Sequence, residues 1–236
     1  LFLVSLPVST ITKTLLLITF PLLFLTLPFS LLQMIEQYDV LCRTGWRRPR
    51  DPIHRRGFNP MVSLHIPAYA EPPEVVISTL DAIAALAYDN YEVLVVDNNT
   101  QDERLWRPLE AHCQKLGPRF RFFHVERLAG AKAGALNFAL DHTSPRAQII
   151  GVIDSDYRPH PHFIRDLVGY FKDPKTGFVQ TPHDYREWEH SAYLAMCYWE
   201  YKPYYHMTQV ALNERDTALT SGTMCLLRKQ AVEDAG

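Results

Sequence analysis

The sequence predicts an α/β domain, in which a mainly parallel sheet lies between helices, preceded by a transmembrane helix. Two observations carry this prediction. Residues 15–35 hold no charged side chain, and from residue 61 onward short β-rich runs alternate with helical ones. Such alternation is typical of a parallel sheet covered on both faces. With 236 residues, 47% of them hydrophobic, the chain can bury one sizeable core.

The uncharged segment is long enough to cross a bilayer. At about 1.5 Å per residue, a helix over residues 15–35 extends roughly 30 Å, which matches the hydrocarbon core. Pro21 and Pro28 would break a soluble helix but are tolerated within membranes. The length disfavours a buried soluble helix, and the apolar residues ahead of the segment disfavour a signal peptide. We therefore expect one or more transmembrane segments within residues 1–36.

A cluster of six arginines follows the apolar segment between residues 43 and 56, where Asp51 is the only acidic residue. Such a cluster beside a span marks the cytoplasmic side of the membrane. Residues 37–59 are therefore interpreted as a basic cytoplasmic linker, and residues 60–236 as a cytoplasmic domain tethered to the lipid bilayer. The whole chain has 24 basic and 26 acidic residues, which gives no reason to expect nucleic acid as a partner.

The order of elements after residue 60 predicts where a ligand binds. Strands are expected at residues 61–66, 91–97, 120–125 and 148–154, and helices at residues 73–86, 103–115 and 131–140. In an open parallel sheet, ligands bind at the carboxyl ends of the strands. The four loops that follow the expected strands are polar or glycine-rich, so we expect them to form one site.

Two charged residues in these loops have more than one explanation. Asp97 ends the second strand, where its carboxylate could bind a planar base or a ribose, or could cap the helix that follows. Lys132 starts the third helix, at the end of the helix dipole that favours anions. An ordinary surface lysine is the simpler explanation of Lys132, and a bound phosphate is the functional one.

Two aspartates, Asp154 and Asp156, follow the fourth strand with one serine between them. Neighbouring carboxylates repel each other, so a cation is expected beside them. Carboxylate oxygens suit Mg²⁺ or Mn²⁺, ions that commonly share their coordination with substrate phosphates. An Asp-x-Asp sequence is common in turns, but its position at the end of a buried strand makes it a candidate metal site.

Two other features have structural explanations. The four cysteines are far apart in sequence and include no Cys-x-x-Cys pair, so neither a disulfide framework nor a zinc site is expected. The aromatic-rich stretch over residues 193–207 is interpreted as a helix packed on a core, with contact to sugar rings or to a membrane interface as the alternative.

The motifs, taken in order, resemble those of the family 2 glycosyltransferases of the GT-A fold, which include cellulose synthase. The resemblance rests on "VSLHIPAYAEPPEVVISTLDAI", "YEVLVVDNNTQDE", "AGAKAGALNFAL", "GVIDSDYRPHPHFIRDLV" and "GFVQTPHDYRE". It covers about residues 60–236, and the last forty residues look most like the membrane β-glucan synthases of the ndvB type. The fold class expected for residues 60–236 is therefore α/β of the GT-A type.

The resemblance implies inverting transfer of a sugar, glucose from UDP-glucose, to a growing β-glucan acceptor, with Mg²⁺ or Mn²⁺ as cofactor. It implies the inner (plasma) membrane of a bacterium as location.

The resemblance also assigns site residues. Around the donor nucleotide it places Pro67, Ala68, Tyr69, Glu71, Asp97, Lys132, Asp154 and Ser155. It places Asp97 at the uracil or its ribose, and Asp154 and Asp156 at the metal, with Asp156 as the direct ligand. Near the donor sugar and the acceptor it places His183, Asp184, Ser221 and Gly222. For His183 and Asp184, a strand-end turn is the structural alternative.

The sequence departs from the family pattern near its end. Inverting members use a carboxylate general base, usually in a Thr-Glu-Asp motif, which is expected beyond Gly236. The pair Glu233 and Asp234 comes too early to supply it. The Gln-x-x-Arg-Trp motif of processive members is absent as well. The chain is thus interpreted as the N-terminal portion of a longer enzyme. Its catalytic base is unknown, and the isolated fragment is expected to be inactive.

Two other classes of function remain as alternatives. A metal-dependent phosphatase or nucleotidyltransferase also uses Asp-x-Asp, but the sequence offers no phosphoryl nucleophile or P-loop. The other alternative is a membrane-tethered module that binds a sugar nucleotide or a glucan without catalysis. Such a module would need the same four strand-end loops but no catalytic general base.

Overall fold

The computed structural model describes residue 5 and residues 7–235, and the chain divides into two compact units. The helical unit comprises residues 1–50 and 184–218, and the sheet unit comprises residues 51–183 and 219–236. The chain therefore leaves the sheet unit after His183 and enters it again at Leu219.

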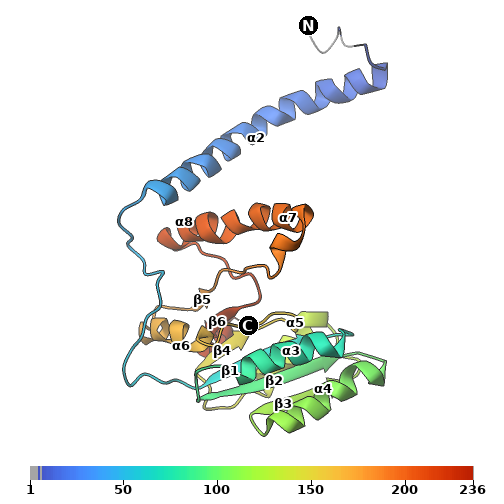
Figure 1. Ribbon diagram of the computed structural model, residues 1–236. Coiled ribbons are helices and arrows are strands. Elements are labelled where there is room, and N and C mark those ends of the chain that lie inside the picture. Colours follow the sequence, from blue (N-terminus) through green and yellow to red (C-terminus); the bar gives the residue numbers. More distant parts are fainter. Residues whose placement is uncertain (1–4, 6, 236) are drawn as a thin grey trace. The chain divides into compact units, whose positions relative to one another are not determined.

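The sheet unit contains a six-stranded sheet in the order β3-β2-β1-β4-β6-β5 (Figure 1). Its strands are β1 (Val62–Ala68), β2 (Tyr91–Asn98), β3 (Phe120–Val125), β4 (Ile149–Val152), β5 (Phe178–Gln180) and β6 (Cys225–Arg228). The strands β1 to β4 are parallel, whereas β6 lies antiparallel to both β4 and β5. The four predicted strands are confirmed. The segments β5 and β6 are strands for which the sequence analysis made no prediction.

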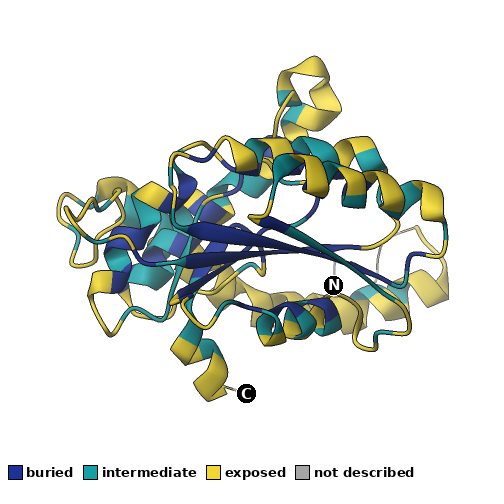
Figure 2. Ribbon diagram, turned by 90° about the horizontal axis from the view of Figure 1, so that it is seen from below, coloured by how far each residue is buried: buried dark blue, intermediate teal, exposed yellow. Residues whose placement is uncertain are grey.

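Helices cover both faces of this sheet (Figure 2). The helices of the sheet unit are α3 (Pro73–Ala84), α4 (Glu103–Leu116), α5 (Ala131–Asp141), α6 (Phe163–Leu167) and α9 (Lys229–Ala235), with a 3₁₀ turn, η1 (Val168–Lys172). Helices α3 and α4 pack against each other on one face, and α5 packs against β1 and β2 on the other. The three helices predicted between the first four strands are confirmed.

The central strands are buried on both faces, because successive side chains point to opposite layers. Leu64 and Val93 pack with Leu80 of α3, whereas Leu94 packs with Ala135 of α5. This double burial explains why the strands appear in the sequence as nearly continuous apolar runs. Figure 2 shows the strands as the dark-blue centre between helices whose outer surfaces are exposed.

The helical unit is built from one long helix and a set of shorter ones. They are α2 (Thr10–Cys42), a 3₁₀ turn η2 (Trp188–His190), α7 (Ala192–Pro203), a π-helical turn η3 (Tyr204–Thr208) and α8 (Gln209–Glu214). The carboxyl-terminal part of the unit, η3 and α8, packs against α2.

Helix α2 continues without interruption through Pro21 and Pro28. None of its residues is buried, and its most apolar window has a mean hydropathy of 2.3. Among the described residues it is the one helix long and apolar enough to cross a membrane. Length and composition alone support that role, since a signal sequence near the N-terminus would have the same properties.

The aromatic stretch packs against a core only in part. Tyr198 of α7 is buried and stacks on Trp188, with ring centroids 4.3 Å apart, and Tyr205 is buried as well. Tyr193 and Trp199 are exposed, however, at 74% and 59%. The prediction of core packing is therefore wrong for these two side chains, because the contacts of α7 with η2 and η3 leave both open to solvent.

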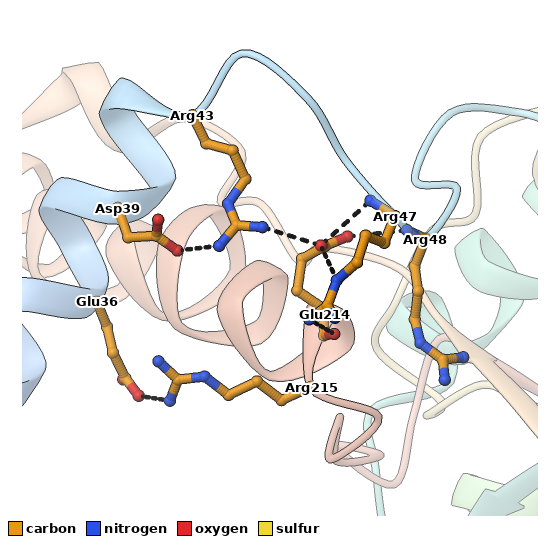
Figure 3. Close-up of polar contacts among 7 residues, drawn as sticks. All are labelled: Glu36, Asp39, Arg43, Arg47, Arg48, Glu214 and Arg215. Atoms are coloured by element: carbon orange, nitrogen blue, oxygen red, sulfur yellow. Dashed lines mark hydrogen bonds and ion pairs between the residues drawn. The ribbon is translucent and has the colours of Figure 1, made fainter.

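A buried carboxylate joins the linker after α2 to the end of α8 (Figure 3). The Glu214 side chain is 3% exposed and accepts hydrogen bonds from the Arg43 guanidinium at 3.1 Å and from the Arg47 and Arg48 backbone N–H groups. The Arg48 N–H bond, helped by the Arg47 N–H and the charge of Arg43, holds the pKa of Glu214 below its usual value against the effect of desolvation. Ion pairs Arg43–Asp39 and Arg215–Glu36 flank this contact.

We expect the substitution Glu214→Gln to loosen the linker, because a neutral amide accepts the three bonds less strongly and leaves Arg43 only its ion pair with Asp39 among the described residues. Faster tryptic cleavage after Arg47 would show this. Asp216→Asn is the control, since Asp216 also pairs with Arg48 but is 76% exposed and should contribute little. Equal cleavage rates in both variants would contradict this role.

Because the pKa of Glu214 is lowered in the folded chain, its contribution to stability should be complete above the unfolded pKa, about 4.3. That contribution should be lost as the pH falls through the lower pKa of the folded chain.

Candidate active site

The loops at the carboxyl ends of β1 to β4 all belong to the sheet unit and meet through hydrogen bonds. Pro67 and Ala68 are the last residues of buried β1, and Tyr69 after them is 60% exposed. The Tyr69 N–H donates to the Glu71 carboxylate, which closes this loop on itself. The next N–H, of Ala70, donates to the Thr100 hydroxyl at 2.9 Å and so joins the β1 loop to the β2 loop.

Asp97 lies at the end of β2 with 2% of its surface exposed. The Thr100 hydroxyl donates to its Oδ1 at 2.6 Å, and His124 Nδ1 lies 2.7 Å from its Oδ2. Asp97 does not cap the following helix, because the N-cap of α4 is Asp102, whose carboxylate accepts from the Arg104 N–H. The capping explanation is therefore wrong, and Asp97 faces the site edge of the sheet.

Two asparagines after Asp97 hold the glycine-rich loop in place. Asn99, with a positive φ of 64°, donates its amide to the Leu128 carbonyl and accepts from the Leu128 N–H, both at 2.8 Å. Asn98 donates its amide to the Ala131 carbonyl at 3.2 Å. These bonds connect the end of β2 to the start of α5, where Lys132 lies.

The first turn of α5 depends on glycine. Gly130, at the N-cap, has a φ of 89°, and Ala131 follows with a φ of 47°. At Gly134 a Cβ would lie 1.9 Å from the Ala129 carbonyl oxygen, so no larger residue fits without a backbone shift. This close approach lets the loop turn back on the helix and places Lys132 at the edge of the sheet.

Lys132 and Asp154 form an ion pair, although they are 22 residues apart in the sequence. Their side chains are 45% and 28% exposed. The geometry brings Lys132 and Asp154 together, so Lys132 is more than an unpaired surface lysine, and their shared role in one site stays a prediction. In the chain as it stands, the Lys132 ammonium offsets part of the charge of the aspartate pair.

The Asp-x-Asp segment follows the buried Ile153. Ser155 is buried and Asp156 is exposed, so the second carboxylate is free to reach a ligand in solvent. The Asp154 N–H donates to the Thr223 hydroxyl at 2.8 Å, which fixes the start of the segment against the loop before β6.

That loop is held by Gln180 and His183. The Gln180 carboxamide accepts from the Ser221 N–H at 2.8 Å and donates to the Thr223 carbonyl at 3.0 Å. His183 is buried, with Nε2 3.3 Å from the Thr223 carbonyl and Nδ1 3.3 Å from the Tyr157 hydroxyl. Burial lowers the pKa of His183, opposed by the bond to Thr223 and by the charge of Asp154.

The geometry thus gathers most of the residues singled out in the sequence. His183 contacts the Thr223 carbonyl, and the Thr223 hydroxyl accepts from the Asp154 N–H. Ser221 is held by Gln180, and Gly222, with a φ of 74°, makes the turn between Ser221 and Thr223. Asp184 is exposed and is the first residue of the second segment of the helical unit.

The carboxylates of Asp154 and Asp156 are better suited to a divalent metal that a bound diphosphate helps to coordinate than to a metal that protein side chains hold alone. No group of three or more His, Cys, Asp or Glu side chains in the described part of the chain is placed to hold a metal. Mg²⁺ usually takes one or two carboxylates and completes its shell with waters and substrate phosphates. Asp154 and Asp156 could supply the two carboxylates.

The sequence analysis missed two groups that position this site, Thr100 and His124. Each acts through a contact between distant segments, and their residue types alone give no signal. The parallel register pairs Asp97 with His124, so a correct alignment of β2 and β3 could have found the histidine.

Comparison with known proteins agrees with the fold and the motifs. The profile of Glycosyl transferase family 2 matches residues 63–236. The UDP-forming cellulose synthase catalytic subunit of Pseudomonas fluorescens (strain SBW25) is 30% identical over 161 residues, which are 66% of this chain and 20% of that protein. The corresponding subunit 1 of Komagataeibacter xylinus is 27% identical over 186 residues, 75% of this chain and 24% of that protein. The chain spans about a quarter or less of these relatives.

A solved structure with the same fold is the mannosyltransferase PcManGT from Pyrobaculum calidifontis, in complex with GDP-Man and Mn²⁺. It superposes with a TM-score of 0.65 and 21% identity, over 88% of this chain and 54% of that one. At this identity the likeness shows the arrangement of strands and helices alone.

Proposed function

Because the chain belongs to glycosyl transferase family 2, we propose that its sheet unit binds a UDP-sugar and transfers glucose, with inversion, to a growing β-glucan. One observation carries the proposal. The loop of Lys132 is bonded to Asn98, next to Asp97, and Lys132 itself pairs with Asp154. These contacts support a nucleotide site at the end of β2 and a diphosphate site at the end of β4, on either side of β1. The names of the UDP-forming cellulose synthases support UDP and glucose.

The nucleotide is proposed to lie across the ends of β1 and β2. Pro67, Ala68, Tyr69 and Glu71 would border it on one side, with the exposed Tyr69 ring free to contact a base. Asp97 would accept a hydrogen bond from the uracil or the ribose. Its burial makes such a bond strong, because water competes poorly for a carboxylate in this position.

The diphosphate is proposed to lie between Lys132 and the aspartate pair, over the buried Ser155. Asp154 and Asp156 would hold Mg²⁺ or Mn²⁺, with Asp156 the direct ligand. When bound, the metal supplies charge stabilisation for the departing diphosphate. Lys132 supplies further positive charge at the start of α5, where the helix dipole also favours an anion.

His183, Asp184, Ser221 and Gly222 are proposed to line the donor sugar and the acceptor. His183 is suited to hydrogen bonding, because burial lowers its pKa and keeps the ring neutral near pH 7. Its contacts with Tyr157 and Thr223 would hold the acceptor side of the site in shape.

The apolar helix α2 is proposed to anchor the enzyme in the inner membrane of a bacterium, with the sheet unit in the cytoplasm, where sugar nucleotides are available. The arginines after α2 support this orientation. A reporter fused after Gly236 should then behave as cytoplasmic, and a periplasmic signal from it would overturn the orientation.

Calorimetry on the 236-residue chain in detergent tests the proposed donor. UDP should bind roughly tenfold or more tightly with Mg²⁺ or Mn²⁺ present than with a chelator, because the metal offsets the repulsion between the aspartate pair and the phosphate oxygens. ADP, which has a different base, should bind more weakly than UDP. Absence of UDP binding under all conditions would refute the proposal, and UDP binding without transfer by the intact enzyme would favour a binding module.

A further inference from the structure

The buried Asp97 and the partly buried His124 form a pair whose geometry suggests more than packing. The two residues face each other in the parallel register of β2 and β3, with His124 Nδ1 2.7 Å from Asp97 Oδ2. The side chains are 2% and 18% exposed. A histidine that donates from Nδ1 fixes its own tautomer and the plane of the carboxylate that accepts.

Asp97 is a buried carboxylate without a permanent cationic partner. In the described part of the chain, its one ion-pair contact is with His124, which is charged only if protonated. Thr100 donates to one oxygen and His124 to the other. Each oxygen can accept more than one hydrogen bond, so both keep acceptor capacity for a ligand at the end of β2.

The imidazole ring of His124 is held in turn by Trp106 of α4. The two rings stack with centroids 4.2 Å apart and an angle of 13° between their planes. On the other side of the ring, Nε2 lies 4.0 Å from the Glu126 carboxylate, too far for a hydrogen bond. The stack fixes the plane of the ring, and the hydrogen bond to Asp97 selects the ring orientation that keeps Nδ1 on the carboxylate.

We infer that His124 is a positioning residue for nucleotide recognition, which holds the Asp97 carboxylate in the orientation that accepts an N–H from the base. The inference rests on the proposed function, because it needs a nucleotide at the end of β2. Its ligand class is a base with an imide N–H, such as uracil, which presents a donor to a fixed carboxylate.

Two substitutions separate the hydrogen bond from the stacking. His124→Asn keeps an amide donor close to the position of Nδ1 but removes the ring. His124→Phe keeps a ring over Trp106 but removes the donor. We expect the Phe variant to lose roughly tenfold or more in UDP affinity, because the Asp97 carboxylate loses the donor that fixes its orientation toward the base. The Asn variant should stay within about threefold of the unsubstituted chain.

Two further variants serve as controls, with melting temperatures measured for every protein. His142→Phe removes a histidine that also stacks, on Phe138 with centroids 4.1 Å apart, but lies at the other end of α5, and it should bind UDP normally. Adding His124→Phe to Asp97→Asn should cause no further loss, since the histidine acts through the carboxylate. If the Phe variant does not fold, His124→Gln replaces it, because its longer side chain moves the donor away from Asp97.

The outcomes distinguish this inference from the proposed function. If the unsubstituted chain binds no UDP, the proposed function fails and the inference with it. If it binds UDP and the Phe variant binds equally well, only the inference fails. Equal losses in the Asn and Phe variants, matched by equal falls in melting temperature, would assign His124 to packing alone and overturn the inference as well.

Discussion

Replacing Asp156 with alanine is expected to remove the dependence of UDP binding on Mg²⁺ or Mn²⁺. It should also reduce sugar transfer by the intact enzyme by roughly 10²–10³-fold, the loss typical when one group that stabilises transition-state charge is removed. The physical reason is the exposure of this carboxylate. Asp154 is already bonded to Lys132, whereas Asp156 projects toward solvent and can reach a metal on a diphosphate.

Calorimetric titration of UDP, with and without metal, measures this coupling. Asp89→Ala is the control, because Asp89 is also exposed but precedes β2, at the opposite end of the sheet. The fold should survive both changes, since neither side chain belongs to the core. An unchanged metal dependence in the Asp156 variant would refute its assignment as a ligand and leave Asp154 to be tested in the same way.

The substitution Gly134→Ala is expected to cause the largest loss of stability among changes at the site. The added Cβ would lie 1.9 Å from the Ala129 carbonyl oxygen, and the obstacle is backbone, which cannot rotate away as a side chain can. Overpacking typically costs about 1–3 kcal/mol, and we expect the upper part of that range or more. The displaced loop should also weaken UDP binding, because Lys132 lies in the same turn.

Urea unfolding measures this effect, with Gly177→Ala as the matched control. A Cβ at Gly177 would have nothing within 4 Å, so the free energy of unfolding should change by less than about 0.5 kcal/mol there. If the two variants unfold at the same urea concentration, the close approach at Gly134 does not constrain the loop.

Local sequence determined the parallel part of the sheet and the order of its elements. Runs such as residues 93–96 are apolar at every position, as a strand buried on both faces requires. The Asp-x-Asp segment could be placed for the same reason, since it follows directly on the apolar residues of β4. The helices between these strands were predictable because turn and capping residues bound each of them.

Two kinds of feature could not be predicted from local sequence. Strands β5 and β6 contain three and four residues, too few for a periodic signal, and they form because Leu226 can pair with both Gly151 and Val179. The aromatic helix α7 has no clear apolar side in its sequence, so which of its rings are buried depends on the elements beside it.

What the sequence by itself determined, then, is which residues can do chemistry and at which strand ends they lie. The tertiary structure decided which of them act together. Asp97 and His124 are 27 residues apart, Asp154 and Thr223 are 69 apart, and Glu214 and Arg43 are 171 apart. Each contact forms because chain segments far apart in sequence meet in the folded chain, through the register of a sheet or the packing of a helix. The local sequence around one residue of such a contact does not determine the strand register or the helix packing that brings the other residue to it.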